Sequence, residues 1–173
     1  MRKLLMAFAV LSMGIFASCD KCKDVDCNNG GSCDDGDCTC ASYYTGDNCD
    51  TEVRAKYAGD YNGIIDIPSF QSLLPTKITV TNPGTVASVQ GMQLVVVTDS
   101  MGTTTTIDLS TNLTSNTEIE VPETKVPFTL IPGETEALIS GTGVYSGDSL
   151  TADITIKGAV SGFTAQSVYK GSK

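Results

Sequence analysis

Seven cysteines are the side chains with the clearest chemical potential in this sequence. They lie within residues 19–49, and residues 50–173 contain none. Thiols at this density can form disulfides, bind zinc as thiolates or exchange electrons through a CxxC pair. Zinc suits a reducing compartment, whereas the N-terminus described below indicates export, and the CxxC at 19–22 lacks the βαβ context of a redox site. Disulfides are therefore expected, and the odd count leaves one cysteine for another role. The seven are Cys19, Cys22, Cys27, Cys33, Cys38, Cys40 and Cys49.

The last six cysteines follow the spacing C-x4-C-x5-C-x4-C-x-C-x8-C, with Asn-Gly-Gly at 29–31 and Gly46 before the last cysteine. This pattern over residues 22–49 resembles the epidermal growth factor (EGF)-like module, although Tyr43 replaces a glycine usual in that family. A segment this small cannot build a sufficient core, and each disulfide would contribute ~2–4 kcal/mol. Spacing alone leaves about 15 connectivities open. The resemblance implies the pairs Cys22–Cys33, Cys27–Cys38 and Cys40–Cys49.

The N-terminus has the parts of an export signal. Two basic residues precede an apolar run over residues 4–16, and the small residues Ala17 and Ser18 suit a cleavage site. A transmembrane helix needs ~20 apolar residues, so a permanent N-terminal anchor is the less favoured alternative. We predict that residues 1–18 are a removable signal peptide.

Phe-Ala-Ser-Cys at 16–19 resembles the lipobox of bacterial lipoproteins, with Phe16 in place of the usual aliphatic residue. The resemblance implies that the Cys19 thiol receives a diacylglyceryl group and that the new amine is acylated, for example with palmitate. The cysteine count supports this independently, because Cys19 lies outside the EGF-like spacing. Three acyl chains would bind a lipid bilayer irreversibly; the alternative is a secreted protein with a free thiol. The expected location is the bacterial outer membrane or cell surface, or else the periplasmic leaflet.

Composition disfavours several kinds of site. Histidine is absent, which removes His-containing catalytic triads and His-ligated zinc. The chain has 20 acidic and 11 basic residues, a net charge of −9, which disfavours nucleic acid as a partner. Calcium-binding EGF-like modules carry acids before the first cysteine and an aromatic between the third and fourth, but residues 34–37 are Asp-Asp-Gly-Asp. We predict a solvated acidic face, with no metal site and no cofactor.

The second part of the chain must form the larger fold. After a charged connector at 50–56, β-branched residues and turn-forming glycines dominate, and helical periodicity is absent. The sequence predicts a mostly β fold of about eight to ten strands that close into an antiparallel barrel, with a two-sheet sandwich as the alternative. With Ala-Gly-Asp-Tyr at 58–61, the layout resembles the lipocalin-like, or calycin-like, barrels of bacterial surface lipoproteins. The predicted strands are 57–67, 77–82, 92–99, 103–110, 126–131, 137–147, 150–160 and 163–171.

Alternation shows which side chains face the core. From Leu150 to Lys157, apolar residues at even positions alternate with mostly polar residues at odd positions. Branched inward residues and aromatic plugs predict a largely filled barrel, because about eight strands enclose little space. The inward candidates are Ile78, Val80, Leu94, Val96, Leu130, Ile154 and Ile156. The core or plug candidates are Tyr57, Tyr61, Phe70, Phe128, Tyr145, Phe163 and Tyr169.

Motifs for catalysis are not found: GxSxG, the P-loop and Asp-Thr-Gly are all missing. We therefore predict that the protein is not an enzyme and that it has no catalytic residue. A carboxylate-based hydrolase stays as an alternative, because two strand aspartates could form a pair. Asp-Ser-Met at 99–101 and Asp-Ser-Leu at 148–150 resemble a short O-glycosylation signal, which would modify Ser100 and Ser149. The candidate carboxylates are Asp60, Asp66, Asp108 and Asp153.

These observations predict three parts: a signal peptide at 1–18, an EGF-like module at 20–50 and a β-domain at 55–173. The leading hypothesis is an exported, membrane-anchored lipoprotein whose EGF-like stalk displays a non-catalytic β-domain for binding or adhesion. Its partner would be an unknown protein or glycan, and the protein itself is expected to be a monomer. The alternatives are a lipocalin-type carrier of a small apolar ligand and the hydrolase.

Overall fold

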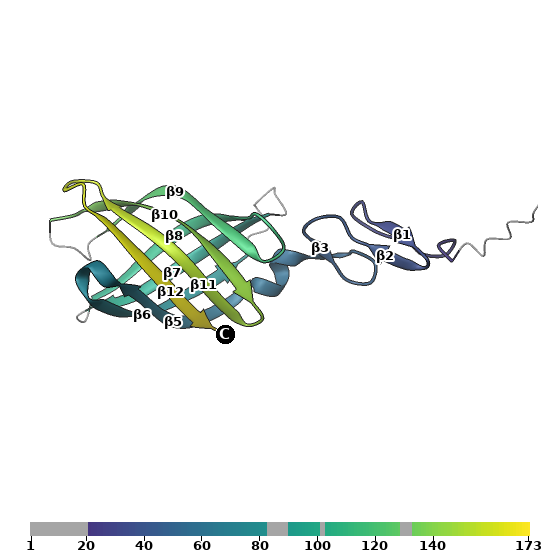
Figure 1. The fold of residues 1–173 in the computed structure, drawn as a ribbon, viewed down its shortest axis with the longest axis horizontal. Helices are drawn as coiled ribbons and strands as arrows, with labels where there is room; N and C mark the ends of the chain where they lie inside the picture. The colour runs from purple at the N-terminus through teal and green to yellow at the C-terminus, as the bar shows by residue number, and fades with distance from the viewer. Residues whose placement is uncertain (1–20, 83–89, 101–102, 129–132) are drawn as a thin grey trace, which may run out of the picture.

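The computed structural model describes residues 21–82, 90–100, 103–128 and 133–173; the predicted signal peptide, Cys19 and Leu130 lie outside them. The described chain is elongated, with a small disulfide-bonded unit at one end and a β-barrel at the other (Figure 1). We call residues 22–49 the disulfide module. The barrel end beside this module is the proximal end, and the opposite end is the distal end.

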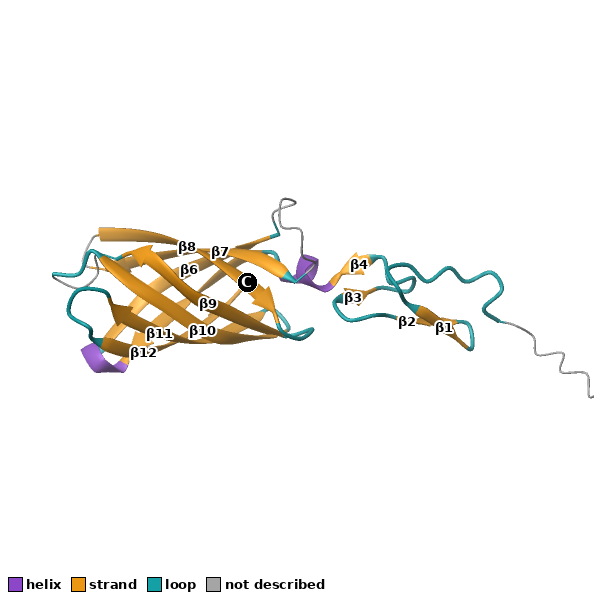
Figure 2. Cartoon of the chain, turned by 90° about the horizontal axis from the view of Figure 1, so that it is seen from above, coloured by secondary structure: helices purple, strands orange, loops and turns teal. Residues whose placement is uncertain are grey.

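The barrel is closed and has eight antiparallel strands, in the order β10-β11-β12-β5-β6-β7-β8-β9 (Figure 2). The predicted barrel is confirmed, and the sandwich alternative is wrong, because the wall returns to β10 instead of dividing into two sheets. Nearly all neighbours in the wall are also neighbours in the chain, so short turns build it. The strands are β5 (Gly59–Ile67), β6 (Ser72–Thr81), β7 (Gly91–Ser100), β8 (Thr103–Leu113), β9 (Glu118–Pro127), β10 (Glu136–Ser146), β11 (Ser149–Gly158) and β12 (Thr164–Ser172).

Alternation of side chains places the core inside the barrel. In β11, Leu150, Ala152, Ile154 and Ile156 are buried, whereas the residues between them are exposed or half-buried. The same period of two runs along β5 and β12. One continuous apolar cluster therefore fills the barrel, which is why the closed wall is stable with one wet face.

β9 differs from the prediction. A strand was expected at 126–131, but the strand is Glu118–Pro127; Phe128 is buried just after it, and 129–132 lie outside the described residues. The segment 118–127 has two prolines and several charges, which favour a loop when local propensity is considered alone. It is a strand because Ile119, Val121 and Val126 are buried in the barrel core.

A short 3-10 helix, η1 (Val53–Tyr57), closes the proximal end of the barrel. This segment was expected to be a connector, yet Val53 and Tyr57 belong to the apolar core cluster. The Arg54 guanidinium is also buried, donating to the carbonyl of Gly91 at 2.8 Å and pairing with Glu52 at 2.6 Å. The chain therefore enters the barrel as part of its packing.

The disulfide module has one small hairpin, shares a second with the residues that follow it, and has almost no core. β1 (Ser32–Asp34) pairs with β2 (Asp37–Thr39), and β3 (Tyr44–Thr45) pairs with β4 (Thr51–Glu52). Most of the module's side chains are exposed or half-buried. Across the parts of the chain that the structure describes, no helix is both long and apolar enough to cross a membrane.

Candidate functional site

Three disulfides hold the module. They join Cys22 to Cys33, Cys27 to Cys38 and Cys40 to Cys49, which are the pairs that the EGF-like resemblance implies. Cys19, the predicted lipidation site, lies outside the described residues, as does the side chain of Ser100. Ser149, the other predicted glycosylation site, begins β11 and is exposed.

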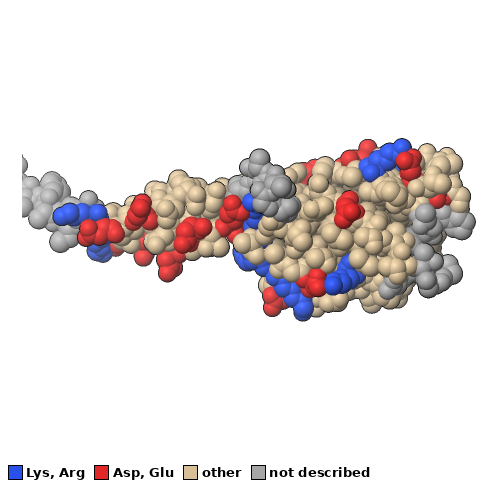
Figure 3. All heavy atoms as spheres, turned by 180° about the vertical axis from the view of Figure 1, so that it is seen from behind, with Lys and Arg blue, Asp and Glu red and all other residues tan. Residues whose placement is uncertain are grey.

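The acidic side chains of the module border a shallow hollow. Its lining includes Asp24, Asp26, Asp37 and Asp47, and its volume is about 570 Å³. Among the described residues, no three His, Cys, Asp or Glu side chains come close enough together to hold a metal ion. Figure 3 shows acidic residues along the narrow module, whereas the face of the barrel seen in this view has broad areas with few charges.

The structure places the four candidate carboxylates on the outer face of the barrel wall. Asp60, Asp66, Asp108 and Asp153 are all exposed and belong to three different strands. Asp153 and Asp66 share one row of the wall, because both are opposite Val168 of β12. Two strand spacings separate them, roughly 10 Å, on the outer face. A hydrolase needs two carboxylates around a bound sugar, and neither described hollow contains these residues.

The barrel interior is filled by its own side chains. The described inward candidates Ile78, Val80, Leu94, Val96, Ile154 and Ile156 are all buried, and the two described hollows lie outside the barrel. Tyr57, Tyr61, Tyr145 and Tyr169 pack together at the proximal end, where the rings of Tyr57 and Tyr145 stack at 3.9 Å. Phe70 was expected in the core but is 45% exposed, because η2 (Pro68–Phe70) turns it out at the distal end against Phe163.

Burial dominates the electrostatics of this tyrosine cluster. It raises the pKa of Tyr61 to about 12, with a smaller contribution from the Asp148 carboxylate, and raises the pKa of Tyr169 to about 12. Burial also raises the pKa of Tyr145 far above its ordinary value. The hydroxyls of Tyr61 and Tyr169 donate to main-chain carbonyls at 3.0 and 2.9 Å, but that of Tyr145 has no hydrogen-bond partner in the described chain. The hydroxyls of Tyr61, Tyr145 and Tyr169 are therefore protonated at neutral pH, and we call the four packed rings the tyrosine plug.

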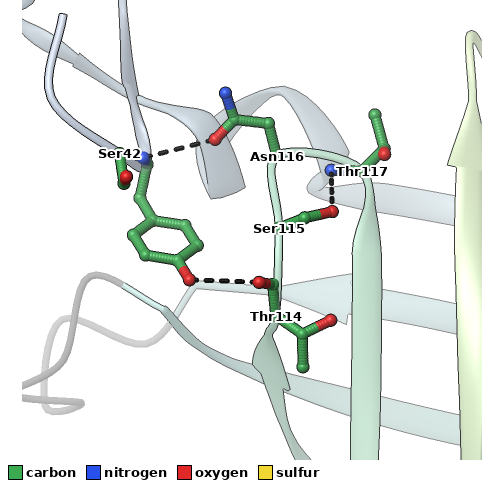
Figure 4. A pocket seen from close by; sticks show the side chains of 6 residues that line it. Ser42, Thr114, Ser115, Asn116 and Thr117 are labelled. Atoms are coloured by element: carbon green, nitrogen blue, oxygen red, sulfur yellow. Dashed lines mark hydrogen bonds between the residues drawn. The ribbon is translucent and has the colours of Figure 1, made fainter.

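The second hollow lies where the disulfide module meets the barrel (Figure 4). It has a volume of about 480 Å³ and is lined by Ser42, Tyr43 and residues 114–117 of the β8–β9 turn. The Tyr43 hydroxyl donates to the carbonyl of Thr114 at 3.3 Å, and the Tyr43 amide donates to Asn116 Oδ1 at 3.3 Å. These hydrogen bonds form a polar joint between the module and the barrel, and the hollow lies beside this joint.

Sequence reasoning missed three residues that organise these regions. Tyr43 was noted only as a departure from the EGF-like pattern, although it makes the joint. Arg54 was counted among the charges of a connector. Glu134 is buried, and its carboxylate accepts from the amides of Val160 at 3.0 Å and Ser161 at 2.8 Å, bridging two distal turns. The hydrogen bond from the Ser161 side chain, joined by these amides, lowers the pKa of Glu134.

No protein-family model and no curated protein matches this chain. Among solved structures, a crystal structure from Bacteroides fragilis, whose protein is provisionally named an outer membrane protein, is similar with 15% identity and a TM-score of 0.43. The likeness covers 70% of this chain and 52% of that one, so this chain spans about half the length of that protein.

Proposed function

We propose that this chain is an exported bacterial lipoprotein, anchored through Cys19, that displays its barrel on an EGF-like stalk to bind a macromolecule. The observation that carries this proposal is the filled barrel. A carrier of the lipocalin type needs an apolar space open at one end. Here the proximal end is closed by η1 and the tyrosine plug, and the inward strand residues are buried against one another.

The joint supports the display part of the proposal. A stalk that positions its cargo needs contacts beyond a single covalent link. Val53 donates its amide to the carbonyl of Tyr43 at 2.8 Å, and the Tyr57 hydroxyl donates to the carbonyl of Asn116 at 2.5 Å. The Val53 bond and the contacts of Tyr43 join the module to the barrel, and the Tyr57 bond fixes η1 against the β8–β9 turn.

The test of display against carriage adds a fluorescent fatty acid to the purified protein. We expect no saturable binding. One-to-one binding at ~1 μM, displaced by unlabelled fatty acid, would replace display with carriage.

The anchor is tested separately. Cells expressing wild type or Cys19→Ser are grown with labelled palmitate, and protease is then added to intact cells. We expect label and membrane attachment in wild type only, and digestion of the barrel at the surface. Equal labelling of both proteins would contradict lipidation at Cys19, and protection from protease would place the protein on the periplasmic side.

A further inference from the structure

The barrel wall has one weakly joined seam, between β8 and β9. In the described part of the chain these strands pair only as Asn112–Glu120 and Leu113–Ile119, beside their turn. Every other pair of neighbouring wall strands is joined by at least five residue pairs. From Thr105 to Thr111, β8 therefore has no described partner strand on the side that faces β9.

A proline explains why the pairing stops. Continuing the observed register would place Ser110 opposite Pro122. Proline has no N–H to donate to the ladder, and it is found in sheets mainly at edges and bulges. β9 also shifts register against β10 between Ile139 and Gly141, which is the level of Pro122. The sequence thus ends the β8–β9 ladder at this residue.

The free side of β8 presents main-chain groups to the seam. The Leu113 amide donates to Gln90 on the β7 side, whereas the Thr114 amide donates to Glu118 on the β9 side. Amides and carbonyls alternate in direction along a strand. β8 pairs with β7 without a register shift, so the amides and carbonyls of Thr106, Asp108 and Ser110 point into the seam.

Side-chain exposure shows that the wall is less tightly packed at the seam than elsewhere in the same rows. Thr105 shares a row with Thr98 and Thr76, and all three face inward, but only Thr105, at the seam, is not buried. Across the seam, Thr124 is likewise half-buried, whereas its inward partner Ile139 is 4% exposed. Each threonine is compared with residues that lie opposite it on neighbouring strands, at the same distance from the barrel end. Position along the barrel axis therefore does not explain the difference in exposure.

The charges beside the seam indicate which kind of segment would bind there. Asp108, Glu118 and Glu120 are exposed, and none of them has an ion pair in the described chain. A second copy of this acidic chain would bring like charges together there. We propose that the β8 edge takes up an extended segment of a partner protein as an added strand, with basic side chains facing outward.

This inference deepens the proposed function by naming a surface and a partner chemistry, and it rests on that function only for the existence of a protein partner. Its test uses the full chain as the cell processes it, purified with its disulfides intact. Failure of anchoring or surface display would therefore not affect the result, and failure of the strand interaction would leave display intact.

The probe is an eight-residue peptide of alternating valine and lysine, titrated while backbone amides are followed by NMR. We expect shifts and slowed hydrogen exchange at Thr106, Asp108 and Ser110. Replacing lysine with glutamate should weaken binding about tenfold or more, since opposite charges across strands attract and like charges repel. Methylation of the peptide amides that face β8 should abolish binding, because it removes the ladder donors.

Two kinds of variant sharpen the test. Pro122→Val restores the missing donor, so it should extend the β8–β9 ladder, slow exchange at Ser110 in the free protein and prevent binding. Asp108→Lys should weaken binding of the lysine peptide about tenfold. Asp153→Lys is the matched control and should not, because Asp153 is an exposed aspartate on a strand paired along both sides.

Four outcomes would overturn the proposal. They are absence of binding up to ~1 mM peptide, equal binding of the methylated peptide, full protection of the three seam amides in the free protein, and dimerisation of the free protein through these amides. The last outcome would assign the edge to a second copy of the chain.

Discussion

Removing one buried hydroxyl should stabilise this protein. Tyr145 is 2% exposed, and its hydroxyl has no hydrogen-bond partner in the described chain. A buried polar group without a partner costs ~1–3 kcal/mol, because folding removes it from water and returns nothing. Tyr145→Phe deletes that group and keeps the ring that stacks on Tyr57. We expect the free energy of unfolding to rise by ~1 kcal/mol.

The same cluster provides matched controls. The hydroxyls of Tyr61 and Tyr169 donate to the carbonyls of Tyr57 and Tyr61, so Tyr61→Phe and Tyr169→Phe each lose a hydrogen bond. These variants should lower the free energy of unfolding by ~1 kcal/mol, which separates them from Tyr145→Phe by ~2 kcal/mol.

The measurement is urea unfolding followed by circular dichroism, supported by thermal melts. For a domain of this size, ~1 kcal/mol corresponds to a shift in Tm of about 4 °C. If Tyr145→Phe destabilised the protein as much as its controls do, a bound water must satisfy the Tyr145 hydroxyl, and the reasoning from an unpaired group would be refuted.

Four further predictions follow from the contacts described. Because Tyr61 and Tyr169 have a pKa raised from 10.0 to about 12, the stability they contribute is complete below pH 10 and lost as pH rises through about 12; absorbance of tyrosinate should therefore rise together with unfolding. Glu134 has a lowered pKa, so its contribution is present above the unfolded pKa and lost as pH falls through the folded one; Glu134→Gln should flatten the acid side of a Tm profile, and an unchanged slope would contradict this. Tyr43→Ala should let the module and the barrel tumble separately in NMR relaxation, whereas unchanged joint tumbling would show that the covalent link suffices. Reduction should unfold the module, since each disulfide contributes ~2–4 kcal/mol, and leave the barrel's circular dichroism intact.

The closed barrel could be predicted because its strands carry the pattern locally. β11 alternates at every position, so its inward face is readable from the sequence alone. β9 could not be recognised in this way, since Pro122 and its charged neighbours argue for a loop and only pairing with β10 makes a strand of them. Local propensity is a weak guide where tertiary contacts decide.

The same distinction between local pattern and tertiary contacts applies to the site residues. The inward apolar residues follow from alternation, but the partners of Tyr43, Arg54 and Glu134 lie far away in the sequence. The amide of Tyr43, for example, reaches a side chain 73 residues away. The seam between β8 and β9 was likewise hidden, because it depends on which residue happens to lie opposite Pro122.

The last strand of the barrel, β12, lies beside the first, β5, so the order of the strands around the wall follows the order along the chain. With an even number of strands, the chain leaves the wall at the end where it enters, and a Cβ on Gly59 would lie 3.4 Å from Lys173 Cε. A circularly permuted chain, joined there and opened at a distal turn, would keep the neighbours of every strand. The first and last strands, β5 and β12, are joined by five residue pairs, whereas β8 and β9 are joined by two. The weakest junction in the wall therefore lies within the β8–β9 hairpin and not between the first and last strands. Under mechanical load the wall would part between β8 and β9, and the turn at 114–117 would still hold the two strands together.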